Sequence, residues 1–149
     1  NLRIFGGLLE LRGKKLSERV DWGLELSQLG SKADARVATL SGGMARRLNL
    51  AASLLHDPAI IICDEPTTGV DPQSRNHLFE TIRALHAEGR TVVYTTHYME
   101  EVEALAERVA IVDHGKVIAD DALSTLVGDG RSLEDVFLDL TGRALRGGG

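Results

Sequence analysis

The feature that most constrains the fold is a short apolar run that ends in two acidic residues. Residues 59–65 read AIIICDE, and PTTGVDP follows. A continuous apolar run of this length is typical of a strand that is buried on both faces, as in a parallel sheet. We therefore expect residues 60–63 to form such a strand, with Asp64 and Glu65 at its carboxyl end.

Helices are predicted on both sides of this strand. Ser41 stands where an N-cap would begin a helix over residues 42–57, in which leucine and alanine recur at helical spacing. Asp71-Pro72 is typical of an N-cap followed by a proline in the first helical position, and Gly89 would end that second helix. The first forty residues also have helical periodicity, with an expected break at residue 30.

The downstream half continues the alternation. Residues 91–95, TVVYT, predict a second strand, and residues 98–107 predict a helix with acidic residues in its first turn. RVAIVDHGKVIAD predicts a hairpin that turns at His114-Gly115. Ser132 and Asp135 resemble a capping box that begins an amphipathic helix. Strands alternating with helices predict an α/β fold with parallel pairing.

Composition excludes several classes of protein. With 149 residues, 43% hydrophobic and 26% charged, the chain has the length and composition of one globular domain. The net charge of −5 provides no basic surface for nucleic acid. No apolar run is long enough for a membrane span, and the N-terminal stretch lacks the pattern of a signal peptide. Cys63 is the single cysteine, so an internal disulfide is excluded.

Two groups of residues can carry phosphate chemistry. In open α/β sheets ligands bind beyond the carboxyl ends of strands, where Asp64 could hold Mg²⁺ while Glu65 positions an attacking water. The alternative is a pair of solvated turn residues. The glycines of Ser-Gly-Gly at 41–43 would leave bare N–H groups at a helix N-terminus, an anion site, unless Ser41 is only a cap.

His97 is the histidine most suited to the same site. It ends the sequence VVYTTH, so its strand should end at the same edge of the sheet as the acidic pair. The other four histidines are interpreted as surface residues. Asp71 is interpreted as an N-cap. Capping uses only one face of its carboxylate, so Asp71 can also have a functional role.

These residues belong to longer segments that resemble a known family. LSGGMARRLNLAASLLHDPAIIICDEPTTGVDP and TVVYTTHYMEEVEALAERVAIVDHGKVIA are similar to the second half of an ABC-transporter nucleotide-binding domain. The order and spacing of its signature, Walker B, D-loop and H-loop motifs match over almost the whole chain. The segments SLEDVFLDLTGR and NLRIFGGLLEL resemble the drug- and polymer-exporting branch.

The resemblance implies a role for each matching residue. Asp64 would bind Mg²⁺ through its coordination shell, and Glu65 would be the general base for the attacking water. His97 would contact the γ-phosphate of ATP, and Asp71 would lie at a dimer interface. Both ATP and Mg²⁺ are therefore expected cofactors.

The signature motif, LSGGM, would contact the ATP that is bound to a second subunit. Ser41, Gly42 and Gly43 would contact the γ-phosphate of an ATP held mainly by the partner, and Met44 replaces the more common glutamine. The resemblance thus implies a dimer with two composite ATP sites. It also implies a transmembrane permease partner, and a cytoplasmic location at the inner face of the cell membrane.

Two motifs of such an ATPase are missing. The P-loop, G-x-x-x-x-G-K-[ST], is absent, and Gly13-Lys14 does not replace it because no buried strand precedes it. The Q-loop glutamine is absent too. In the family the P-loop strand runs between the strands assigned to 91–95 and 109–113. We therefore expect a partial P-loop NTPase fold, inactive and not fully stable alone, with an exposed strand edge.

Three segments are expected within this partial fold. Residues 1–39 would be the remainder of a helical subdomain, residues 40–120 the catalytic half with all four motifs, and residues 121–149 a C-terminal helical extension.

Other readings remain open at this point. The C-terminal ATPase lobe of an SMC-type DNA-maintenance protein also carries the signature and Walker B without a P-loop, but it should follow a heptad-patterned coiled coil. A soluble ABC-type translation factor would need a second cassette. A non-catalytic regulatory module would be expected to have lost Glu65 or His97, and both are present.

Overall fold

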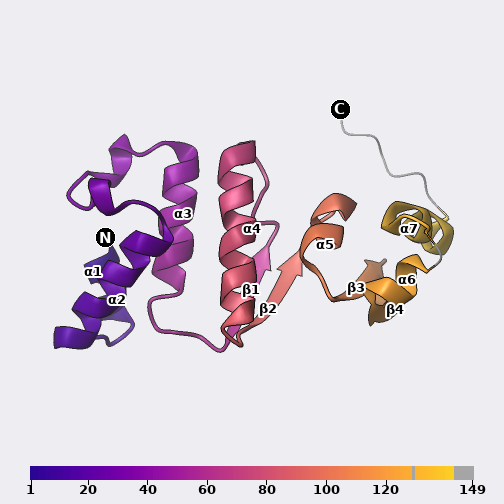
Figure 1. The fold of residues 1–149 in the computed structure, drawn as a ribbon, viewed down its shortest axis with the longest axis horizontal. Helices are drawn as coiled ribbons and strands as arrows, with labels where there is room; N and C mark the ends of the chain where they lie inside the picture. The colour runs from indigo at the N-terminus through magenta and orange to yellow at the C-terminus, as the bar shows by residue number, and fades with distance from the viewer. Residues whose placement is uncertain (129, 143–149) are drawn as a thin grey trace. The chain divides into compact units, whose positions relative to one another are not determined.

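The computed structural model describes residues 1–128 and 130–142, so the end of the expected C-terminal extension, residues 143–149, lies outside the described part. The chain divides after Thr95 into two compact units. The first unit contains α1 (Leu2–Leu8), α2 (Gly13–Leu26), two 3₁₀ turns (Gly30–Lys32 and Val37–Thr39), α3 (Gly42–Ser53), β1 (Ile60–Asp64), α4 (Pro72–Ala87) and β2 (Thr91–Thr95) (Figure 1). The second contains α5 (Met99–Leu105), β3 (Arg108–Asp113), β4 (Lys116–Ala122), α6 (Leu123–Val127) and α7 (Leu133–Thr141).

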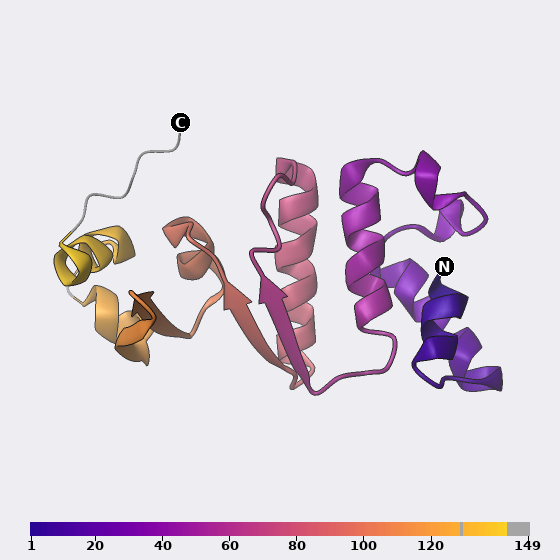
Figure 2. The same ribbon diagram turned by 180° about the vertical axis from the view of Figure 1, so that it is seen from behind.

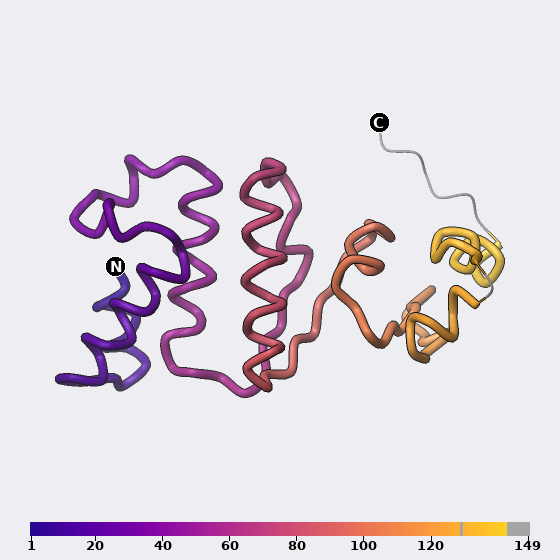
Figure 3. Tube along the Cα trace, viewed as in Figure 1, coloured from indigo at the N-terminus to yellow at the C-terminus, as the bar shows by residue number. Residues whose placement is uncertain are grey.

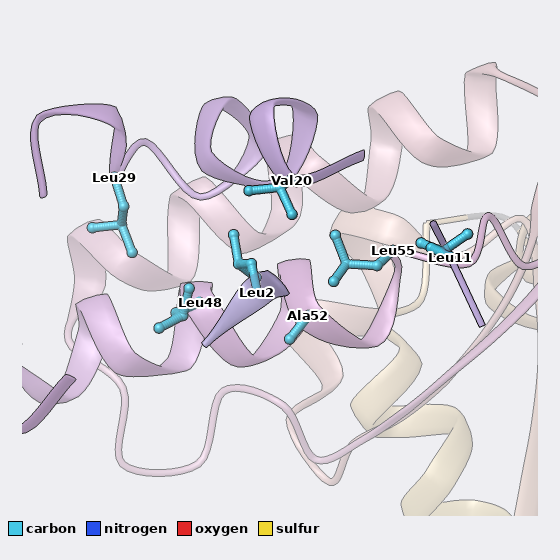
Figure 4. Packing of buried hydrophobic residues seen from close by; sticks show 7 residues of the cluster. All are labelled: Leu2, Leu11, Val20, Leu29, Leu48, Ala52 and Leu55. Carbon is cyan, nitrogen blue, oxygen red and sulfur yellow. The ribbon is translucent and has the colours of Figure 1, made fainter. Parts of the chain in front are cut away.

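Helices α1 to α3 pack around a core of their own. The buried side chains of this core come from all three helices and from the segments that follow each of them (Figure 4): Leu2, Leu11, Val20, Leu29, Leu48, Ala52 and Leu55. Arg19 closes the C-terminus of α3 by donating to the carbonyl oxygens of Leu55 (2.8 Å) and Leu54 (2.7 Å). The same guanidinium lies 3.9 Å from the ring centroid of Trp22.

Helix α2 ends earlier than the sequence predicts. Its last residue is Leu26, and Gly30, the expected stop, begins a 3₁₀ turn instead. The cause is local: the buried Ser27 hydroxyl donates to the Gly23 carbonyl at 2.7 Å, and Gln28 takes the left-handed conformation with φ 54°. A polar residue therefore adopts the conformation that glycine usually supplies at a helix end.

Strands β1 and β2 pair in parallel, as predicted. Their register places Ile62 opposite Val93 and Asp64 opposite Thr95. Helix α4 runs along one face of this pair, and Figure 2 shows the same arrangement from behind. The helix begins at the predicted N-cap, Asp71, and ends two residues before Gly89.

The expectation that β1 is buried on both faces is wrong. Ile61 and Cys63 are buried, whereas Ile60 and Ile62 are 62% and 72% exposed. Successive side chains of a strand point to opposite faces, and the described residues cover only the face that α4 occupies. Burial raises the pKa of the Cys63 thiol, which agrees with its interpretation as a core residue.

The second unit is built on an antiparallel hairpin. Strands β3 and β4 are joined by His114 (φ 46°) and Gly115 (φ 74°), which confirms the predicted turn and matches a type I′ turn. Val109 and Ile111 of β3 form a small core with Val136 of α7. The capping box at the start of α7 is confirmed, while the short helix α6 was not anticipated as a separate element.

In the first unit the N-terminus of α3 lies against the N-terminus of α4. Figure 3 follows the chain from α3 through β1 into α4, with the two helices running alongside each other. No helix among the described residues is long and apolar enough to cross a bilayer.

Candidate functional site

The acidic pair lies at the carboxyl end of β1 and is tied to β2. Asp64 is the last residue of the strand, and Thr95 is its partner in the register. The Thr95 hydroxyl donates to Asp64 Oδ1. The backbone N–H of Glu65 donates to both the carbonyl and the hydroxyl oxygen of Thr95, each at 3.1 Å. One threonine therefore fixes the carboxylate of Asp64 and the backbone of Glu65 together.

The backbone at Glu65 is strained. Its φ of 40° lies in the left-handed region, which side chains other than glycine rarely occupy. The turn that follows stabilises this conformation, because the Thr68 N–H donates to the Glu65 carbonyl at 3.2 Å and the Thr68 hydroxyl donates to Glu65 Oε2 at 3.4 Å. A strained residue that several neighbours hold in place is typical of functional sites.

The signature motif begins α3, as expected. Ser41 is the N-cap, and its hydroxyl oxygen accepts the N–H of Met44 at 3.3 Å. A Cβ added at Gly42 would meet no atom within 4 Å, so this glycine lies open at the helix N-terminus. Backbone N–H groups at such an end attract anions.

Gly43 differs from Gly42 because it lies against the start of α4. A Cβ added there would lie 2.1 Å from Ser74 Oγ and 2.8 Å from Asp71 Oδ2. The structure therefore brings the signature motif and Asp71 together through a contact that leaves no room for a side chain. This contact is a structural reason for the glycine that the sequence pattern alone did not supply.

Asp71 is held as an ionised N-cap. Its Oδ1 accepts the Ser74 N–H at 3.0 Å. This backbone hydrogen bond, and then the Ser74 hydroxyl, hold the pKa of Asp71 below its usual value of 3.8. The carboxylate is fully exposed and therefore remains charged at neutral pH.

His97 belongs to the second unit and is the second residue after β2. Its ring lies 4.1 Å from that of Tyr98, centroid to centroid. The segment after β2 is anchored by Thr96, whose hydroxyl donates to the buried carboxylate of Glu101 at 2.7 Å and accepts the Tyr98 N–H at 3.0 Å.

Within each of the two units, sequence reasoning missed residues that hold the candidate residues in place. Thr95 and Thr96 each act through their hydroxyl groups, and the Thr-Thr pair directly before His97 was the available signal. Glu101 was interpreted only as an acidic residue in a favourable first helical turn, but it also anchors Thr96. Arg46 contacts the turn after β1, and nothing in the sequence except its place in the signature helix indicated this contact.

The residues at this strand end are compatible with Mg²⁺ held together with a nucleotide. Within residues 1–128 and 130–142 no three histidine, cysteine or acidic side chains are grouped to hold a metal. Mg²⁺ is commonly bound by one or two carboxylates together with phosphates and water, and the exposed Asp64 carboxylate is a ligand of this kind. A cavity of about 220 Å³ between α3, β1 and α4 borders Asp64. It is smaller than the pockets of about 300–1,000 Å³ that hold drug-sized ligands.

The rejected P-loop candidate is confirmed as unrelated to a phosphate loop. Gly13 begins α2 and follows α1 rather than a strand. The Lys14 side chain is exposed and pairs with Glu18 on the same helix at 3.5 Å.

Comparison with known proteins places this chain in a family. Residues 8–103 match the family model "AAA domain, putative AbiEii toxin, Type IV TA system". The chain is 45% identical over 127 residues to the Nod factor export ATP-binding protein I of Rhizobium sp., covering 85% of this chain and 42% of that protein.

Two further relatives are named for resistance to linearmycin and to daunorubicin. The linearmycin resistance ATP-binding protein LnrL of Bacillus subtilis is 46% identical over 133 residues, covering 87% of this chain and 43% of that protein. The daunorubicin resistance ATP-binding protein DrrA2 of Streptomyces coeruleorubidus is 47% identical over 134 residues, covering 88% and 42%. The chain thus spans less than half the length of these relatives.

The solved structures that resemble this chain also come from ABC transporters. An ATP-binding subunit of an ABC transporter superposes with a TM-score of 0.79 at 25% identity, covering 94% of this chain and 60% of that one. An ABC transporter in an inward-facing conformation shares the fold, with a TM-score of 0.78 at 16% identity, covering 95% and 56%. The α/β architecture is therefore part of the P-loop NTPase fold. The chain belongs to the matched AAA-domain family, and the known proteins that it resembles are ATP-binding proteins of ABC transporters.

Proposed function

We propose that this chain is the C-terminal part of the ATP-binding subunit of an ABC exporter, in which MgATP binding and hydrolysis drive transport. The observation that carries the proposal is the Asp64–Glu65 pair at the carboxyl end of β1, fixed to β2 through Thr95. The named relatives are export and resistance proteins, which favours this reading over the DNA-maintenance alternative.

In this proposal the two carboxylates have different tasks. Mg²⁺ bound with the nucleotide would supply charge neutralisation on the phosphate oxygens, and Asp64 would help to hold it. Glu65 accepts a proton from the attacking water and orients it toward the γ-phosphate. His97 contacts the γ-phosphate by donating a ring N–H to one of its oxygens.

The signature motif serves the ATP site of a second subunit. The open position of Gly42 and the helix N-terminus behind it support binding of an anionic phosphate. Met44 lies in the first turn of the same helix and completes the motif. Asp71 lies against Gly43, so one surface of this unit would meet the partner with both residues.

The transmembrane permease and the location at the inner face of the membrane follow from the exporter assignment. They are proposals for the complete protein, of which residues 1–39, 40–120 and 121–149 would be three successive parts. Because the sequence contains no G-x-x-x-x-G-K-[ST], we expect residues 1–149 alone not to hydrolyse ATP.

Glu65→Gln in the complete gene product tests the catalytic assignment. We expect ATP binding to persist while turnover falls by about 10²–10⁴-fold, because the general base is lost. Glu80→Gln, an equivalent change on an exposed position of α4, is the control and should hydrolyse ATP at the wild-type rate. Unimpaired turnover in Glu65→Gln would refute the role of Glu65.

Ser41→Arg tests the composite site. A bulky cation at the start of α3 should block ATP-dependent dimer formation while each subunit still binds nucleotide. Ser53→Arg places the same side chain at the exposed end of the same helix and should leave dimer formation intact. ATP-dependent dimers of Ser41→Arg in light scattering would mean that the signature does not act on the partner's site.

A further inference from the structure

Arg46 joins the signature helix to the turn that follows β1. Its Nε donates to the carbonyl oxygen of Pro66 at 3.1 Å, and its Nη2 donates more weakly to the carbonyl of Glu65 at 3.5 Å. These are side chain to backbone contacts across twenty and nineteen positions of sequence, between two different elements. A guanidinium suits such a pair of acceptors because its donors are held in a fixed plane.

The turn that Arg46 reaches is the strained one. Glu65 has φ 40°, and a conformation of this kind persists only where the surroundings hold it. On the amide side Thr95 accepts the Glu65 N–H. On the carbonyl side the contacts come from Thr68 within the turn and from Arg46 on α3. Arg46 thus supplies the link from another helix to the carbonyl side of Glu65.

The neighbouring arginine shows that the link is specific. Arg47 is the next residue of the same helix, and its Nη1 donates to Gln28 Oε1 at 3.3 Å. Successive residues of a helix point about 100° apart, so the two cations serve different elements. Arg47 ties α3 to the end of α2, whereas Arg46 ties it to the loop that carries Glu65.

We infer that Arg46 is a positioning residue that couples α3 to Glu65. The N-terminus of α3 carries Ser41, Gly42 and Gly43, and Arg46 lies one turn further along. A displacement of this helix is therefore passed to the backbone of Glu65 through the guanidinium.

The consequence for the enzyme rests on the proposed function. There, the signature motif contacts the ATP of the partner subunit, while Glu65 acts on the ATP of its own subunit. Arg46 then connects the two composite sites within one chain, so that occupancy of one site adjusts the position of the base in the other.

Hydrogen exchange of the complete gene product tests the link without reference to catalysis. In Arg46→Ala, the amides of residues 64–70 should exchange about tenfold faster, because a charge-assisted anchor of the turn is lost. The melting temperature should change little, since Arg46 is an exposed residue. Arg47→Ala removes the same charge one residue away and should leave exchange at 64–70 as in the wild type.

Arg46→Lys separates charge from geometry. Lysine keeps the positive charge but lacks the planar pair of donors, so exchange at 64–70 should lie between those of the wild type and Arg46→Ala. Exchange at 64–70 that is the same in Arg46→Ala as in the wild type would overturn the inference, as would equal acceleration in Arg47→Ala.

The rate of ATP hydrolysis measures whether Arg46 affects catalysis. Arg46→Ala should lower kcat about tenfold with KM for ATP unchanged, because the base is misplaced and the nucleotide contacts remain. An unchanged kcat would overturn the inference. Unimpaired turnover in Glu65→Gln would instead refute the proposed function, and the exchange result would still decide whether Arg46 anchors the turn.

Discussion

The two strand pairs of this protein differ in how each obtains a core. β3 and β4 are consecutive, antiparallel and joined by a two-residue turn, and their buried residues Val109 and Ile111 pack against Val136. β1 and β2 are parallel and joined through α4. Only alternate residues of β1 are buried, and Ile60 and Ile62 are largely exposed.

The difference lies in the distance along the chain and not in complete burial, because burial alternates in β3 as it does in β1. The hairpin obtains its core from α7 within a short stretch of sequence, although Val112 and Val117, direct partners across its strands, are 58% and 62% exposed. The parallel pair leaves an uncovered face, formed by Ile60, Ile62 and Val93, of which Ile62 and Val93 are direct neighbours across the strands. Exposed apolar patches of this kind mark interaction surfaces. We expect other chain segments to cover this face in the complete protein.

Truncation of a fully buried core side chain tests whether the two units are independent. Leu55 is fully buried among α1, α2 and α3, so Leu55→Ala should cost about 2–5 kcal/mol of stability. Hydrogen exchange should show the loss in residues 1–95 and leave residues 108–122 protected. Equal loss of protection in both regions would mean that the two units unfold as one.

A pair of glycine substitutions tests the contact between α3 and α4. Gly43→Ala forces a Cβ into Ser74 and Asp71 and should cost about 1–3 kcal/mol in urea unfolding. Gly42→Ala meets open space and should be neutral or slightly stabilising, because alanine favours a helix more than glycine does. Equal effects would show that the close packing at Gly43 is not present in solution.

Removal of the cap of α7 should affect only the hairpin unit. Ser132 accepts the Asp135 N–H at 3.1 Å and begins the capping box, so Ser132→Ala should cost about 1 kcal/mol. Ser124→Ala alters a helix without a side-chain cap and should have no measurable effect. A loss of protection in α3 of the Ser132→Ala variant would contradict the separation of the two units.

The smallest expected effect is a pH dependence in the first unit. Arg90 donates to Asp57 Oδ1 at 2.6 Å, and this hydrogen bond, with the charge of Arg19, lowers the pKa of Asp57 from 3.8. A carboxyl whose pKa is lower in the folded state stabilises the fold above pH 3.8 and loses that contribution as pH falls below it.

Asp57→Asn checks the sign of this effect. Because the carboxylate is largely exposed and screened by water, the variant should lose no more than about 1 kcal/mol at neutral pH. The difference from the wild type should disappear in unfolding experiments well below pH 3.8. A difference that grows on acidification would contradict the assignment.

The elements that were predicted correctly carry local signals. Asp71-Pro72 specifies the start of α4 through a side-chain cap and a fixed φ, and His114-Gly115 specifies the hairpin turn through its positive φ angles. Both depend on residues within a few positions, so a single sequence contains the information. The error at Ile60 and Ile62 arises because burial depends on which layers cover a strand, and this is a non-local property.

The same distinction applies to the candidate site. Asp64, Glu65 and the signature glycines were identified because their residue types and spacing suit phosphate chemistry. Arg46 could not be found in this way, since its role comes from helix rotation rather than from a motif. The Thr-Thr pair before His97 gave a signal for Thr95, but its partners depend on the strand register. Candidate site residues can therefore be proposed from the sequence, whereas most of the residues that hold them in place are identified only from the structure.

Sedimentation velocity of residues 1–149 alone, over a range of concentrations, tests most directly the claim that the β1–β2 sheet is incomplete in this chain. We predict concentration-dependent self-association, driven by the uncovered face of Ile60, Ile62 and Val93 and by the unpaired edge beside it. A single monomeric species at every concentration, with one cooperative unfolding transition, would contradict the account.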